Sequence, residues 1–227
     1  MTTSSDTTSE FTEASRENYI RDPHKIEQES FQRIRQLSDL SAFDQDQAQI
    51  AMRLIHTCGE PSISSRINIS HSAIKSGIAA INANAPVLCD VEMVKHGLTK
   101  RMIEQEVHCF LNDSRVPDIA KAEGETRTMA ALRFWEPLVE GSIVLIGNAP
   151  TALFRLMEMI ENGSPKPALI IGIPVGFVGA AESKDALITF CQQHDIACIT
   201  VTGYVGGSAM TAAAFNALLR LNKGIRF

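Results

Sequence analysis

The sequence lacks the spacings that mark a metal site or a disulfide framework. No CxxC motif occurs, and no HxxxH or HExxH spacing relates any of the six histidines. We therefore expect reduced thiols, mostly packed in the core, and no metal bound by the protein. The five cysteines are Cys58, Cys89, Cys109, Cys191 and Cys198.

Long apolar runs, basic clusters and nucleotide motifs are also missing. No stretch approaches the ~20 apolar residues of a membrane span. With a net charge of -5 and no dense run of Lys or Arg, a nucleic-acid partner is not expected. The segment GIPVGFVG does not have the GxGxxG spacing, and Lys184 does not follow a glycine as a P-loop lysine does, so an NAD or ATP site is disfavoured. The N-terminus has no signal-peptide apolar region, which predicts the cytoplasm.

The chain divides into a polar tail and a longer part with regular patterning. Residues 1–18 are rich in Ser and Thr and predict a disordered tail, whereas residues 19–227 are expected to form a single domain. Asp22 followed by Pro23 is typical of a helix start. The residues that then follow helical spacing are Ile26, Ser30, Ile34 and Leu37.

A second helix is predicted from Asp44 to Gly59. Gln47 stands three residues after Asp44, in capping-box spacing, and Gly59 suits a helix C-terminus. His56 then lies near the end of this helix, with Arg53 about one turn before it.

The remaining chain alternates between apolar runs of strand length and helical stretches. Such alternation, with strands that are apolar on both faces, predicts an α/β fold of three layers (α/β/α) around a mainly parallel central sheet. The predicted strands cover residues 66–70, 85–90, 107–111, 142–147, 168–173 and 196–201. The predicted helices cover residues 71–83, about 126–136, 150–162, 181–193 and 208–221.

Three of these strands end in loops that suit a ligand site. In open α/β sheets ligands bind beyond the carboxyl ends of the strands, and glycine lets backbone approach them closely. The first N–H groups of a following helix also attract anions. The loops contain Asn148-Ala149-Pro150, PVGFVGAAESK and TGYVGGSAM, with Gly176, Gly179, Gly206 and Gly207 as the candidate binding glycines. The alternative is that these glycines only form tight turns.

His56 taken alone is ambiguous. A histidine at a helix end is more often structural than catalytic. The helix C-terminus would stabilise its cationic form and Arg53 would oppose it, so its pKa is expected within a few units of neutrality. Such a pKa suits proton transfer.

The ambiguity is reduced by a resemblance that covers most of the chain from residue 19 onward. Seven successive blocks resemble the precorrin-8X methylmutase family in order and spacing, and PVGFVGAAESK is the most distinctive part of them. The blocks are YIRDPHKIEQESFQRIR, RLIHTCG, APVLCDVEMVKHGLTK, ETRTMAALRFW, IGNAPTALFRLMEMI, PKPALIIGIPVGFVGAAESKDAL and VGGSAMTAAAFNALL.

The resemblance implies a homodimeric isomerase of cobalamin biosynthesis that uses no cofactor. Such an enzyme moves a methyl group from C-11 to C-12 of the tetrapyrrole precorrin-8X in a suprafacial 1,5-shift and gives hydrogenobyrinate. It implies that His56 is the catalytic acid–base residue, and that Ser30, Arg53 and Arg127 contact the substrate. Arg53, Arg127 and Lys184 are then candidates for contacts with substrate carboxylates. For Lys184 a solvated helix residue or a charge that stabilises the fold is the favoured alternative, and for Arg127 a surface position is an equal one.

Other interpretations stay open at this stage. The substrate could be the cobalt-containing analogue. The chain could instead be a corrinoid carrier that hands its ligand to the next pathway enzyme, or an unrelated α/β enzyme for a carboxylated metabolite. Thr202 and Tyr204 stand where relatives often have basic residues, and EPSISSR also departs from the family pattern, which puts substrate range at that corner in doubt.

Overall fold

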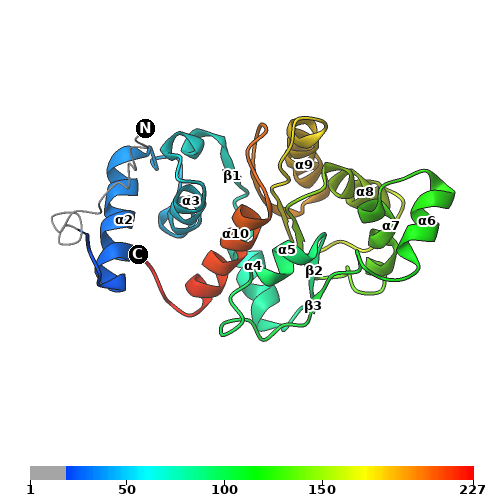
Figure 1. Cartoon of the computed structure of the whole chain (residues 1–227), viewed down its shortest axis with the longest axis horizontal. Helices are drawn as coiled ribbons and strands as arrows, with labels where there is room; N and C mark the ends of the chain where they lie inside the picture. Colours follow the sequence, from blue (N-terminus) through cyan, green and yellow to red (C-terminus); the bar gives the residue numbers. More distant parts are fainter. Residues whose placement is uncertain (1–18) are drawn as a thin grey trace, which may run out of the picture.

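The computed structural model describes residues 19–227, so the tail predicted over residues 1–18 lies outside the described residues. A six-stranded sheet forms the centre, with helices on both faces (Figure 1). The strands are β1 (Ile67–Ile69), β2 (Val87–Cys89), β3 (Val107–His108), β4 (Ile143–Ile146), β5 (Leu169–Gly172) and β6 (Ala197–Val201).

The sheet is mainly parallel, as predicted. Its strand order is β1-β6-β5-β4-β2-β3, and only the edge strand β1 runs antiparallel to its neighbour. In that pair Ile67 lies opposite Val201. The carboxyl ends of β4, β5 and β6 therefore meet at one edge of the sheet, where the sequence placed the glycine-containing loops.

The helices divide between the two faces of the sheet. One face carries α4 (Ala73–Asn82), α5 (Glu92–His96) and α10 (Ser208–Asn222), with α3 (Gln45–Cys58) packed on α10 and α2 (Pro23–Leu37) packed on α3. The other face carries α8 (Pro150–Glu161) and α9 (Ala180–His194), with α7 (Arg127–Leu132) beside α8 and α6 (Val116–Glu123) beside α7. In Figure 1, α2 and α6 consequently lie at opposite ends of the molecule.

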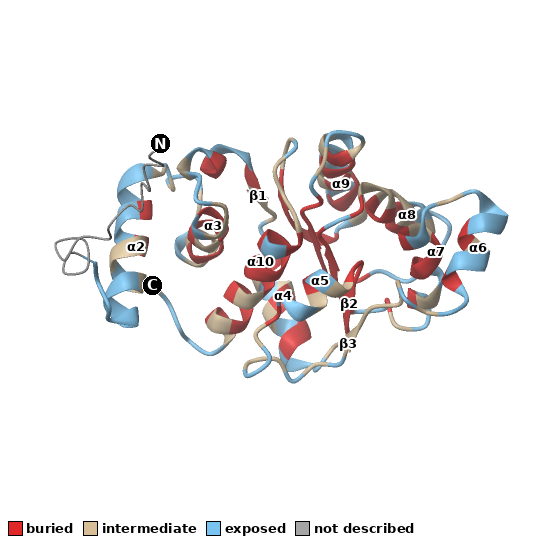
Figure 2. Cartoon of the chain, in the orientation of Figure 1, coloured by how far each residue is buried: buried red, intermediate tan, exposed pale blue. Residues whose placement is uncertain are grey.

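Two apolar cores lie on the two sides of the sheet, and the strands are buried throughout most of their length (Figure 2). Alternate strand residues supply each core. Ile143 and Leu145 of β4 face the core under α10, whereas Val144 faces the core under α8. This double burial explains the unbroken apolar runs in the sequence.

The predicted helix caps are confirmed at atomic detail. The Asp22 carboxylate accepts hydrogen bonds from the backbone N–H groups of His24 and Lys25, at 2.8 and 3.2 Å. Asp44 and Gln47 form the complete capping box at the start of α3, and the helix ends at Gly59 with φ of 70°. These caps fix where α2 and α3 begin, and so fix the positions of their side chains.

Three short helical segments were not predicted: η1 (Pro61–Arg66), α5 and α6. They have six, five and eight residues, too few for a helical period to emerge from the pattern. A further 3₁₀ turn, η2 (Arg133–Trp135), ends the predicted 126–136 helix. No helix within residues 19–227 is both long and apolar enough to cross a bilayer.

Candidate active site around His56

His56 lies in the last turn of α3, and its imidazole faces α2. Ser30 Oγ is 2.9 Å from His56 Nδ1, so the hydroxyl fixes the ring orientation. If Ser30 donates, Nδ1 is the acceptor and Nε2 carries the proton; if Nδ1–H donates, Nε2 is the basic nitrogen. Within residues 19–227 Nε2 has no hydrogen-bond partner, so it is the nitrogen that can meet a substrate.

Aromatic rings hold the imidazole from one side. The Phe31 ring stacks on His56 with 5.3 Å between centroids and an angle of 17° between planes. On Phe31 stacks the ring of Phe227, at 3.8 Å and 10°. Phe31 is buried, so the two stacked rings form a rigid floor that restricts how the imidazole can tilt.

Arg53 is held close to this stack by a carboxylate and by the rings. Its guanidinium lies 4.8 Å from the centroid of Phe31 and 4.3 Å from that of Phe227. Arg53 Nη2 donates to Glu27 Oε1 at 3.1 Å. Arg220 Nη2 lies 3.6 Å from the same oxygen, so two guanidinium groups share one carboxylate.

These neighbours act on the protonation of His56. Burial is the largest influence and lowers the pKa of His56 below its ordinary value, and the charge of Arg53 lowers it further. The Glu27 carboxylate opposes both. Arg53 thus opposes the cationic form of His56 as expected, but the group that favours this form is Glu27, where the helix C-terminus was expected, and burial outweighs both.

The glycine-containing loops after β5 and β6 pack on each other by backbone. Gly207 N–H donates to Ile173 O at 2.8 Å, and Gly176 N–H donates to Tyr204 O at 3.3 Å. A Cβ at Gly206 would lie 2.4 Å from Ile173 O, which excludes every other residue there. Gly179, with φ of 78°, is the N-cap of α9. The visible role of these glycines is loop packing, and ligand binding by them stays a prediction.

The loop after β4 is occupied by the protein's own anion. The buried Asp90 carboxylate accepts hydrogen bonds from the N–H groups of Gly147, Asn148 and Ala149, at 3.1, 2.8 and 3.0 Å. Burial raises the pKa of Asp90, and these three bonds oppose that rise. These three N–H groups are therefore engaged, which corrects the expectation that this loop offers its donors to a ligand.

Lys184 is not solvated, and of the two alternatives favoured over a carboxylate contact the structure shows the fold-stabilising charge. Its side chain is fully buried, and Nζ donates to Val205 O at 2.8 Å. Burial lowers the pKa of Lys184 to about 8. The ammonium therefore connects α9 to the loop after β6. The loops after β5 and β6 pack on each other, which brings Lys184 Nζ within reach of the Val205 carbonyl.

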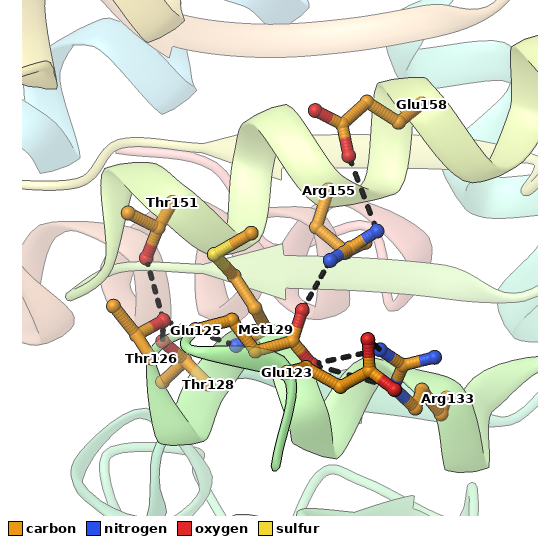
Figure 3. Close-up of polar contacts among 9 residues, drawn as sticks. All are labelled: Glu123, Glu125, Thr126, Thr128, Met129, Arg133, Thr151, Arg155 and Glu158. Atoms are coloured by element: carbon orange, nitrogen blue, oxygen red, sulfur yellow. Dashed lines mark hydrogen bonds and ion pairs between the residues drawn. The ribbon is translucent and has the colours of Figure 1, made fainter. Parts of the chain in front are cut away.

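Arg127 begins α7, far from α3 in the same chain (Figure 1). Its Nη2 donates to Leu111 O at 3.0 Å. The residues before it are firmly held, as Figure 3 shows: Glu125 pairs with Arg133 and Arg155, and Thr126 Oγ1 lies 3.0 Å from Thr151 Oγ1. The start of α7 is thereby fixed to α8.

The structure therefore brings Ser30, Arg53 and His56 together and leaves Arg127 apart. Among residues 19–227, no hydrogen bond, ion pair or ring contact joins His56 to the glycine loops. Sequence reasoning missed the roles of Glu27, Phe31, Arg220 and Phe227. Glu27 and Phe31 flank Ser30 on α2 and could have been found by helical spacing, but Phe227 has no sequence signal that relates it to His56.

Comparisons with known proteins identify the family of the chain. The family model described as precorrin-8X methylmutase matches residues 25–221. A precorrin-8X methylmutase from Sinorhizobium is 49% identical over 205 residues, covering 89% of this chain and 97% of that protein. A cobalt-precorrin-8 methylmutase from Methanocaldococcus jannaschii is 35% identical over 184 residues, covering 81% of this chain and 84% of that protein.

A solved structure gives the same result for the fold. The crystal structure of a precorrin-8X methyl mutase from Thermus thermophilus superposes with a TM-score of 0.78 at 34% identity, covering 89% of this chain and 98% of that one. Sequence and fold thus agree over nearly the same span. The chain belongs to the precorrin-8X methylmutase family, the isomerases of cobalamin biosynthesis.

Proposed function

We propose that this chain moves a methyl group from C-11 to C-12 of precorrin-8X and so forms hydrogenobyrinate, with His56 as the acid–base residue. The observation that carries the assignment of His56 is its geometry: Ser30 and Phe31 orient the ring, and Nε2 is left open. The cobalt-free substrate is supported by the higher identity to a relative named for precorrin-8X than to one named for the cobalt compound.

In the proposed reaction the cationic imidazole donates one proton to the macrocycle near ring C. The positive charge that develops on the ring system makes the 1,5-shift of the methyl group easier. Loss of one proton then gives the conjugated product, so the proton count is unchanged. General acid–base catalysis contributes about 10²–10⁴-fold, and binding of the ring in a reactive shape supplies much of the rest.

The variant His56→Ala tests this assignment. We expect it to fold and to bind hydrogenobyrinate, because His56 is exposed and lies in the last turn of its helix. The absorbance change of turnover is expected to fall by at least about 10²-fold, the usual range for a positioned acid. Turnover near the wild-type rate would remove His56 from the mechanism.

We also infer a homodimer whose site is completed by a second copy. Arg127 is expected to contact the substrate, yet its helix lies at the other end of the chain from α3. The loops after β5 and β6 carry exposed apolar side chains: Phe177 is 87% exposed and Val178 is 89% exposed. The ring centroids of Phe177 and Tyr204 lie 5.6 Å apart, so the two loops share one apolar patch. Such a patch suits burial against another subunit.

The cytoplasm stays the expected location, and transfer of the product to the next pathway enzyme stays a prediction. A non-catalytic corrinoid carrier would bind hydrogenobyrinate without turnover of precorrin-8X. The His56→Ala comparison separates the two functions, because a carrier would show no turnover in either protein.

A further inference from the structure

A groove of about 340 Å³ lies between α3, the segment of residues 97–102 and α10. Arg53 and Thr57 line it from α3, Arg101 from the segment, and Arg220 from α10. We call it the arginine groove, after Arg53, Arg101 and Arg220. At the lower end of small-molecule pocket sizes, it is too small for a corrin ring but large enough for short side groups.

The groove is strongly positive in a chain whose net charge is negative. Three arginines are among the residues that line it, and no Asp or Glu is. The one nearby carboxylate, Glu27, is shared by Arg53 and Arg220. Within residues 19–227 Arg101 has no hydrogen bond or ion pair, and the buried Nε of Arg220 has no partner. The exposed guanidinium of Arg101 is therefore available to an anion.

The walls of the groove are fixed before any ligand arrives. Asn216 of α10 joins it to the segment that carries Arg101: Thr99 N–H donates to Asn216 Oδ1 at 2.9 Å, and Asn216 Nδ2 donates to Gly97 O at 3.0 Å. Three alanines of α10, Ala209, Ala212 and Ala213, add small side chains to the lining. Such pre-organisation lowers the entropic cost of binding.

The position of the groove connects it to the candidate active site. Thr57 is the residue next to His56, and Arg53 lies about one turn before it. At the other end the groove reaches Ala209, two residues after Gly207 in the loop that follows β6. It thus runs from the catalytic helix toward the edge of the sheet.

We propose that the arginine groove binds acetate or propionate side groups of the corrin macrocycle while the ring reacts at His56. Guanidinium groups recognise carboxylates through paired N–H donors, and a macrocycle with several such side groups can fill more than one of them. The proposal rests on the proposed function and assigns Arg101 and Arg220 to substrate binding.

The test is the affinity for hydrogenobyrinate of the variant Arg101→Gln. Arg101 is exposed, so its loss is not expected to change the unfolding temperature. We expect the dissociation constant to rise about three- to tenfold, typical of one solvent-exposed charged contact, and the wild-type affinity to fall more steeply with salt than that of the variant. The KM for precorrin-8X is expected to rise with the dissociation constant, because the substrate carries the same carboxylate side groups as the product.

Lys75→Gln is the matched control, because it removes one exposed positive charge from α4 outside the groove; it should bind like the wild type. Citrate is the probe for a free small polycarboxylate. Unchanged hydrogenobyrinate affinity in Arg101→Gln, a loss confined to citrate, or a fall in kcat alone would each overturn the groove proposal. Turnover of precorrin-8X by the variant would still support the proposed function, so the two failures are distinguishable.

Discussion

The imidazole of His56 is surrounded by groups that shift its pKa in opposite directions. Burial and Arg53 favour the neutral ring, whereas Glu27 favours the cation. A substrate carboxylate bound to Arg53 would offset the charge of that arginine and so raise the pKa of His56. Substrate binding would then generate the acid that the proposed reaction needs.

At this scale we expect Glu27→Gln to lower the pKa of His56 further, because the variant removes the group that raises it. NMR titration of the imidazole measures the shift. If the cationic form is the acid, kcat/KM falls as pH rises through this pKa, and the whole profile moves to lower pH in the variant.

Glu29→Gln is the matched control for this titration. Glu29 is on the same helix, is exposed to nearly the same extent as Glu27 (38% against 37%), and pairs with Arg33 instead of Arg53. An equal shift in both variants, or a higher pKa in Glu27→Gln, would contradict the electrostatic role of Glu27. Because folding lowers the pKa of His56, its contribution to stability is present above the ordinary pKa of histidine and is lost as pH falls through the lowered one.

Among the secondary-structure elements, the junction of α7 with α8 depends on one carboxylate. The side chain of Glu125 is only 6% exposed and pairs with both Arg133 and Arg155, which come from η2 and α8 (Figure 3). Glu125 immediately precedes Thr126, the N-cap residue of α7, so this pairing also holds the start of the helix that carries Arg127.

We expect Glu125→Gln to lower the free energy of unfolding by about 1–3 kcal/mol, because charged hydrogen bonds of a nearly buried carboxylate are lost. Urea unfolding measures the change. The matched control is Glu158→Gln, which removes an ion pair of Arg155 whose carboxylate is 53% exposed. It should cost at most about 0.5 kcal/mol. Equal effects of the two variants would show that burial of Glu125 is irrelevant.

For the whole molecule, the distance between α3 and α7 in one chain decides how the site can be assembled. The helices that carry His56 and Arg127, α3 and α7, lie on opposite flanks of the sheet (Figure 1). In the proposed dimer the two residues of one site would come from different copies. A two-fold dimer would place both residues twice and form two equivalent sites.

Mixing inactive variants tests this arrangement. We expect His56→Ala and Arg127→Ala to be impaired alone and to recover about a quarter of wild-type activity when mixed, since about half the dimers are then mixed and each has one intact site. His56→Ala mixed with Ser30→Ala should recover nothing, because these residues belong to the same half-site. Equal recovery in both mixtures, or none in either, would contradict a shared site.

The elements that were predicted correctly have strong local signals. The caps at Asp22 and Asp44, the helix end at Gly59 and the doubly buried strands are each determined by residues a few positions apart. By contrast, α5 and α6 are too short for a period, and the antiparallel direction of β1 depends on its pairing with β6, distant in the sequence.

The sequence by itself determined the α/β layering, the helix that carries His56 and the family, because caps, apolar runs and motif blocks are local patterns. Only the tertiary structure decided which groups surround the imidazole. Ser30 reaches His56 from α2, and Phe227, the last residue described, stacks on the ring of Phe31. Lys184 is buried where α9 meets the loop after β6. Contacts between distant segments depend on the packing of the whole chain, and no local pattern records them.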